Sequence, residues 1–94
     1  MSVDPSTVLQ LESDVRQTRV AGEGVILRQD DGEILVINEV AIRFVELIDG
    51  NRSLGELTEL LLQEYDVEKD RLAADLAEYA SELMDQNVLT TAAA

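Results

Sequence analysis

The stretch Glu33-Ile34-Leu35-Val36-Ile37-Asn38 decides the fold of this chain, because it reads as the last strand before a helical half. Four consecutive apolar residues are typical of a strand that is covered on both faces. A last strand with no later strand to pair with lies at a sheet edge, where its free N–H and C=O groups need water or another chain as partners. We therefore expect an edge strand that a partner chain can extend.

Two earlier strands are predicted, at residues 15–20 and 25–28. Between them, Ala21-Gly22-Glu23-Gly24 predicts a turn, because its two glycines tolerate positive φ. Asp31-Gly32 lies between two apolar runs and is a strong hairpin signal. The first half of the chain therefore predicts a small antiparallel meander.

Three helices are predicted after the meander. Asn38 can cap the first, at residues 39–48, whose apolar residues recur on one face. Ser53 begins a capping box before the second, at about 54–64. Asp66 can cap a third, longer helix that ends near residue 86. The predicted fold class is α+β, a winged-helix-like domain with a three-stranded antiparallel meander followed by three helices.

The domain is expected to span residues 15–89, as one unit with a single modest core. Residues 1–14 are expected to form a flexible N-terminal arm, from which Val8, Leu9 and Leu11 could still reach the core. Residues 90–94 are expected to fray.

Composition excludes several classes of function. The 94 residues contain no cysteine and no histidine, which removes disulfides, Ser-His-Asp and Cys-His catalysis, and histidine metal sites. We expect no catalytic activity, no cofactor and no metal. No apolar run approaches the ~20 residues of a membrane span, and the N-terminus lacks signal-peptide features, so a cytoplasmic protein is expected. The net charge of −13 disfavours nucleic acid and anionic membranes as partners.

Several blocks of the sequence resemble a known family. Ile37-Asn38-x-x-Ala41 is followed by Leu47-Ile48-Asp49-Gly50-x-Arg52-Ser53 and then by Glu56-Leu57. In order and spacing, these blocks resemble the PqqD-like proteins, the precursor-peptide recognition elements of many ribosomal peptide-modifying pathways. The resemblance covers about residues 15–89. It continues through the tail at Tyr65, Val67, Leu72, Asp75, Leu76, Tyr79, Leu83, Val88 and Leu89.

The resemblance implies a non-catalytic peptide-binding module. Family members bind the leader segment of a precursor peptide as a further strand along their third strand, in a groove walled by the third helix. They present it to a modifying enzyme, often a radical SAM protein or a peptidase. Carried over to this chain, the peptide-binding residues are Ile34, Leu35, Val36, Ile37, Asn38, Leu72, Asp75, Leu76, Tyr79 and Leu83.

The resemblance leaves the pathway open. Ile48 stands where members involved in pyrroloquinoline quinone biosynthesis often have cysteine, and Asn87 stands where glycine is usual. Another peptide pathway, such as lasso-peptide maturation or radical SAM peptide maturation, is therefore equally compatible. The oligomeric state is also open, because an unfilled edge permits a monomer or a strand-paired or swapped dimer.

The residues themselves point to the same site less specifically. Leu72, Leu76 and Leu83 could equally form core, because an apolar helix stripe usually faces inward. Tyr79 is a better groove residue, because a buried tyrosine usually requires a polar partner for its hydroxyl. Asp75 could accept a hydrogen bond from a ligand or simply face solvent.

Four other functions compete with this one. A carboxylate-based enzyme is disfavoured, because none of the Asp and Glu residues falls at a recognised motif spacing. An acyl or peptidyl carrier would use Ser53 as its attachment site, but Arg52 replaces the expected aspartate, and carriers lack a hairpin. DNA binding by the winged helix is disfavoured, because ten acidic residues follow Leu54 against Lys69 and Arg71. A winged-helix protein-interaction domain is a further alternative.

Overall fold

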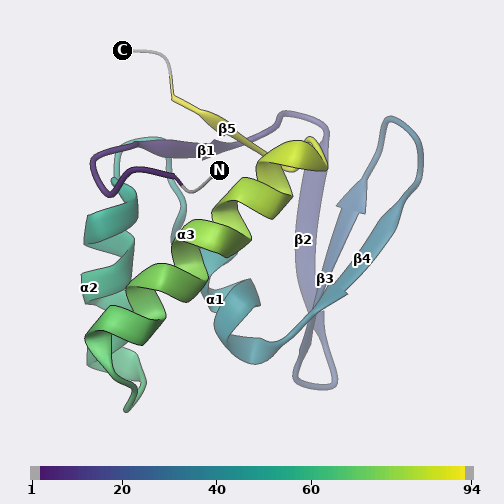
Figure 1. The fold of residues 1–94 in the computed structure, drawn as a ribbon. Coiled ribbons are helices and arrows are strands. Elements are labelled where there is room, and N and C mark those ends of the chain that lie inside the picture. The colour runs from purple at the N-terminus through teal and green to yellow at the C-terminus, as the bar shows by residue number, and fades with distance from the viewer. Residues whose placement is uncertain (1–2, 93–94) are drawn as a thin grey trace.

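A computed structural model describes residues 3–92 of the chain (Figure 1). Strands β2, β3 and β4 form a three-stranded antiparallel sheet in that order, and β1 pairs with β5. The predicted α+β class, with a meander followed by three helices, is confirmed. In chain order the elements are β1 Leu9–Leu11, β2 Val15–Val20, β3 Glu23–Arg28, β4 Ile34–Ile37, α1 Glu39–Leu47, α2 Leu54–Glu64, α3 Lys69–Asp85 and β5 Leu89–Thr91.

The pairing of β1 with β5 was not predicted. We expected a flexible arm at residues 1–14 and fraying at 90–94, but Leu9 lies opposite Thr91 in a second antiparallel sheet. Figure 1 shows this pair at one end of the molecule. The leucine side chain of Leu9 is fully buried, so core packing holds the segment in place. Residues 1, 2, 93 and 94 of the two predicted segments lie outside the described range.

The two hairpins of the three-stranded sheet are built differently. Ala21 and Gly22 have φ of 52° and 84°, the two consecutive positive values that a tight two-residue hairpin requires. Gly24, which we expected in that turn, lies inside β3 instead. The Asp31-Gly32 signal is confirmed, with φ of 73° at Gly32 in the loop between β3 and β4.

Gly24 allows α1 to lie directly on the sheet. A Cβ atom at this position would come within 2.3 Å of the Ile42 Cβ and 2.8 Å of the Ile37 Cγ1. Ile42 is fully buried, so it has no free space into which it could retreat. Since only Asn38 separates β4 from α1, this contact also determines where the edge strand passes into the helix.

The helix caps are partly as predicted. The Asn38 side chain accepts a hydrogen bond from a first-turn N–H of α1. The Ser53 hydroxyl accepts from the Glu56 N–H at 3.2 Å, and the Glu56 carboxylate accepts from the Ser53 N–H at 3.0 Å. The prediction of Asp66 as the third cap is wrong. Glu68 occupies that position without a side-chain hydrogen bond, because α3 begins later than its apolar periodicity suggested.

A single core joins the three helices to both sheets. Phe44 from α1, Leu57 and Leu61 from α2, and Ile26 from β3 are fully buried within it. Figure 1 shows α3 crossing the front of the molecule with α1 behind it. None of the helices within residues 3–92 has the length and apolar character needed to span a bilayer.

We predict that Gly24→Ala lowers the free energy of unfolding by about 1–3 kcal/mol, because the added methyl group overpacks the contact with Ile42. Urea denaturation measures the change. Gly32→Ala is the matched control, because its added methyl group has no neighbour within 4 Å and costs only the strain of a positive φ. A Gly24→Ala protein as stable as the unmodified chain would show that α1 does not rest on β3 in this way.

Candidate functional site

Strand β4 has a neighbour on one side only, β3, so its other edge is open. The Arg28 N–H donates to the Glu33 carbonyl at 2.9 Å, which makes this cross-strand pair hydrogen-bonded. Hydrogen-bonded and non-hydrogen-bonded pairs alternate along an antiparallel ladder. The main-chain N–H and C=O groups of Ile34 and Val36 therefore point away from β3, toward the open side.

The other two residues of β4 hold it to the domain. By the same alternation, Leu35 and Ile37 direct their main-chain groups toward β3, and their side chains are half-buried against the core. The side chains of Ile34 and Val36 are 61% and 64% exposed. The strand is thus anchored on one side and available on the other.

A cleft of about 400 Å³ lies beside the junction of β4 and α1. One wall is the start of α1, and the other is α3 from Arg71 to Tyr79 with the loop before the helix. Most of the lining surface is apolar, which suits a cleft that takes up a side chain. The lining residues are Asn38, Val40, Ala41, Val67, Arg71, Leu72, Asp75, Leu76 and Tyr79.

The structure brings most of the predicted site residues together. The four residues of β4 form the open edge, and Asn38, Leu72, Asp75, Leu76 and Tyr79 line the cleft. Leu83 is buried in the core and does not line the cleft, because at this level of α3 the apolar stripe faces inward.

Four lining residues were missing from the predicted set: Val40, Ala41, Val67 and Arg71. Ala41 and Val67 belong to the blocks that carry the family resemblance, so a signal for them was present. Val67 is also an exposed large apolar residue in a loop. Val40 and Arg71 carry no comparable signal, because periodicity assigns a residue to a helix face but does not show whether that face is covered.

Tyr79 has a polar group that the fold leaves without a partner. Its ring packs against Phe44, with ring centroids 6.2 Å apart. The hydroxyl oxygen is buried and has no hydrogen-bond partner within residues 3–92. Burial raises the pKa of Tyr79 to about 12, and the negative charge of Glu82 contributes to the shift. The phenol is therefore neutral at physiological pH and can act as a hydrogen-bond donor.

The rim of the cleft carries exposed charge. The side chains of Arg71 and Asp75 are 83% and 68% exposed and form an ion pair at 3.9 Å. A pair as exposed as this contributes little to stability and leaves both groups available to a ligand. Further along α3, Glu78 and Glu82 are exposed as well. The α3 side of the site is therefore mainly acidic.

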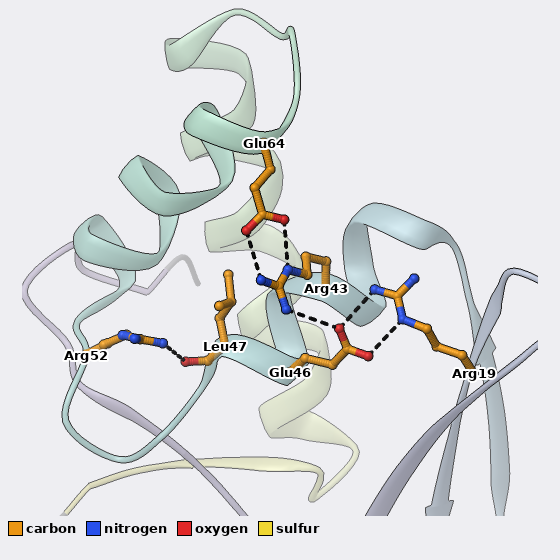
Figure 2. Close-up of polar contacts among 6 residues, drawn as sticks. All are labelled: Arg19, Arg43, Glu46, Leu47, Arg52 and Glu64. Carbon is orange, nitrogen blue, oxygen red and sulfur yellow. Dashed lines mark hydrogen bonds and ion pairs between the residues drawn. The ribbon is translucent and has the colours of Figure 1, made fainter.

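A network of ion pairs holds α1 in position (Figure 2). Arg19 of β2 donates two hydrogen bonds to the Glu46 carboxylate of α1, at 2.8 and 2.9 Å. Arg43 of α1 donates two to Glu64 of α2, at 2.8 and 3.0 Å, and reaches Glu46 at 3.5 Å. The network joins β2, α1 and α2. The first turn of α1 forms one wall of the cleft, so the network helps to position that wall.

The same arginines lower the pKa of the carboxyl groups that they contact. The hydrogen bonds from Arg19 hold the pKa of Glu46 below its usual value, and those from Arg43 do the same for Glu64. In the same last turn of α1, the Arg52 guanidinium donates to the Leu47 carbonyl at 2.9 Å, as Figure 2 also shows. The C-terminal half of α1 is therefore held by several polar contacts.

Within the described range, no three His, Cys, Asp or Glu side chains are grouped in a way that could hold a metal ion. The chemistry that the site offers is hydrogen bonding from an open strand edge, an apolar cleft and an acidic rim.

Comparison with known proteins gives consistent results. The family model of coenzyme PQQ synthesis protein D (PqqD) matches residues 23–89. The chain is 30% identical over 89 residues to the PqqA binding protein of Gluconobacter oxydans (strain 621H), covering 95% of this chain and 93% of that protein.

Two solved structures have the same fold. TbiB1 in complex with the TbiA(beta) leader peptide superposes with a TM-score of 0.75 at 20% identity, covering 85% of this chain and 93% of that one. Lasso peptide synthetase B1 complexed with the leader peptide superposes with a TM-score of 0.76 at 20% identity, covering 88% and 98%.

We predict that Glu46→Gln lowers stability at neutral pH by about 1 kcal/mol, and that this difference disappears in acid. The pKa of Glu46 in the folded protein lies below its usual value of 4.5. A carboxylate with a depressed pKa stabilises the fold above its unfolded pKa and stops doing so as the pH falls through its folded pKa.

Urea denaturation of both proteins from pH 7 downward measures the effect. Glu59→Gln, which breaks a more exposed pair with Lys69, is the control and should have a smaller effect. A Glu46→Gln deficit that persists unchanged in acid would show that the carboxylate charge is not what holds α1.

Proposed function

Since this chain belongs to the PqqD family, we propose that it captures the leader segment of a ribosomally made precursor peptide and presents it to a modifying enzyme. The observation that carries the proposal is the open edge of β4 beside an apolar cleft. Binding by strand addition needs both features, because main-chain hydrogen bonds supply affinity and side-chain pockets supply specificity.

The open edge determines how the peptide pairs. The outward N–H and C=O groups of Ile34 and Val36 bind the main chain of the peptide, which lies along β4 as a further strand. Leu35 and Ile37 keep their bonds to β3, so the domain retains its own sheet during binding. The peptide needs no particular side chains for this part of the contact.

The cleft supplies the selective part of the contact. A peptide that lies along β4 passes Asn38 and reaches the cleft, where Leu72 and Leu76 offer an apolar floor. An extended peptide places alternate side chains on the same face, so one apolar side chain enters the cleft while its neighbours point away. Asp75 and Glu82 near the rim favour basic residues close to that anchor.

The role is one of binding and presentation. The relative in Gluconobacter oxydans is named for binding PqqA, which supports a non-catalytic module. The partner enzyme is a radical SAM protein or a peptidase, and the cytoplasm, where ribosomal peptides are made, is the compartment. A monomer leaves β4 free for the peptide, whereas a strand-paired dimer would compete with it.

The carrier alternative receives no support from Ser53. Its hydroxyl is occupied as the N-cap of α2, and the Glu56 carboxylate completes the capping box. A serine used in this way has a full structural explanation.

A titration followed by NMR tests the proposal. The labelled chain is titrated with the PqqA peptide, the TbiA(beta) leader peptide and extended peptides selected from a display library, each beside a scrambled version. Binding should shift the amides of Ile34 and Val36 and the residues of the cleft. If no peptide from these sources binds, or if bound peptides leave β4 and the cleft unshifted, the proposal is wrong.

A proline pair gives a sharper prediction. Val36→Pro should leave the domain folded and weaken peptide binding by about two- to tenfold, because it removes an outward N–H whose hydrogen bond is worth roughly 0.5–1.5 kcal/mol. A steric clash of the proline ring with the peptide would add to this loss. Leu35→Pro should destabilise the fold, because it removes a bond to β3. Circular dichroism reports the fold and calorimetry the binding. Equal unfolding by both prolines would mean that β4 is not an open edge.

The acidic rim predicts a charge effect on association. Asp75→Asn should slow the association of a basic peptide at low salt, and the difference should shrink near 1 M salt, where the Debye length falls to about 3 Å. Glu59→Gln changes the net charge equally but lies on α2, away from the cleft, so it should have less effect. Stopped-flow kinetics measure both rates. Equal slowing by the two variants would assign the effect to overall charge rather than to the rim.

A further inference from the structure

We infer that the Tyr79 hydroxyl donates a hydrogen bond to a main-chain carbonyl of the peptide bound at β4. The inference rests on the proposed function. It adds a residue that binds the main chain of the peptide on the side facing away from β4. It starts from one observation: Tyr79 lines the cleft, yet its buried hydroxyl has no partner within residues 3–92.

The buried hydroxyl of Tyr79 differs from the buried hydroxyl of Thr58, because it has no hydrogen-bond partner within residues 3–92. Burial of a hydroxyl without a hydrogen bond is unfavourable, and buried tyrosines usually have a partner. The buried hydroxyl of Thr58 shows the ordinary solution, since it donates to the Leu54 carbonyl at 2.9 Å. Gln17 and Arg28 also have an unpartnered buried atom, but neither residue lines the cleft.

The chemistry of the site selects the kind of partner. Tyr79 is protonated at neutral pH, as an ordinary tyrosine is, and burial raises the pKa of its phenol further, to about 12. It therefore offers a donor and calls for an acceptor. A carboxylate acceptor would be repelled by Glu82 and by the exposed Asp75. A neutral carbonyl meets the requirement without this repulsion.

The geometry of strand addition supplies such a carbonyl. A peptide strand beside β4 turns half of its main-chain groups toward Ile34 and Val36, and the other half away from them. The groups that turn away form a new edge, and their oxygens need donors. Tyr79 stands on α3, in the wall of the cleft that faces the start of α1. Because its hydroxyl is buried in the free chain, the peptide reaches it by displacing the side chains that cover it.

Tyr79→Phe is the decisive variant, because it removes the hydroxyl and keeps the ring against Phe44. The free protein should be as stable as the unmodified chain or more stable, since the lost group had no partner. Peptide affinity should fall about two- to tenfold, the usual range for one hydrogen bond. A purely structural role for Tyr79 would lower stability and affinity together.

Tyr65→Phe is the matched control. Tyr65 is the other of the two tyrosines in the chain, and it does not line the cleft. Its loss should leave peptide affinity unchanged. With no tryptophan in the sequence, the Tyr65→Phe protein also contains a single tyrosine. The Raman ring doublet of Tyr79 then reports whether its hydroxyl becomes a hydrogen-bond donor when a tyrosine-free peptide binds.

An ester scan of the peptide identifies the acceptor. The probe is the tightest-binding peptide of the NMR titration, resynthesised with one amide replaced by an ester at each position in turn, because an ester carbonyl is a weaker acceptor. Calorimetry with the unmodified chain and with Tyr79→Phe completes a double-variant cycle at each position. One ester should cost affinity with the unmodified chain and little with Tyr79→Phe.

The outcomes separate the inference from the function on which it rests. If no peptide binds the unmodified chain, the proposed function fails. If a peptide binds the unmodified chain and Tyr79→Phe equally well, strand capture stands and the hydrogen bond is refuted. A loss of affinity in Tyr79→Phe that couples to no ester position refutes a main-chain acceptor.

Discussion

The contact between Gly24 and Ile42 is the constraint on which the site depends. A strand residue without a Cβ lets α1 approach β3 closely, and Ile42 fills the space that a side chain would occupy. Asn38 is the single residue between β4 and α1. The distance at which α1 packs against β3 therefore also determines where the open edge ends and where one wall of the cleft lies. The ion pairs of Glu46 with Arg19 and Arg43 then fix α1 laterally, so the wall is held from two directions.

Features with a local signal were predictable from the sequence. The strand at residues 34–37, the Asp31-Gly32 hairpin and the Ser53 capping box each follow from a few adjacent residues, and the structure contains all three. The same four apolar residues are typical of a strand covered on both faces, yet Ile34 and Val36 are exposed. Asn87 stands where the family usually has glycine, and the backbone conformation explains why asparagine can replace it. It has φ of 61°, the left-handed conformation that glycine adopts most easily and that asparagine tolerates better than most residues.

Features that depend on distant parts of the chain were not predictable. The pairing of β1 with β5 joins strands of three residues from opposite ends of the sequence, and so short a strand shows no alternation. The role of Gly24 depends on a helix that passes over it, whereas in the sequence it reads as one of two turn glycines. The apolar stripe of α3 identified a face, but only packing separates the buried Leu83 from the cleft residue Tyr79.

The exposed side chains of Ile34 and Val36 also affect how the protein behaves in concentrated solution. An unpaired strand edge that carries bulky apolar side chains is a surface on which identical molecules can stack into larger sheets. The net charge of −13 opposes such stacking, because each approaching copy carries the same large negative charge. The acidic surface thus gives colloidal protection, because it keeps identical copies apart while the edge of β4 remains unpaired.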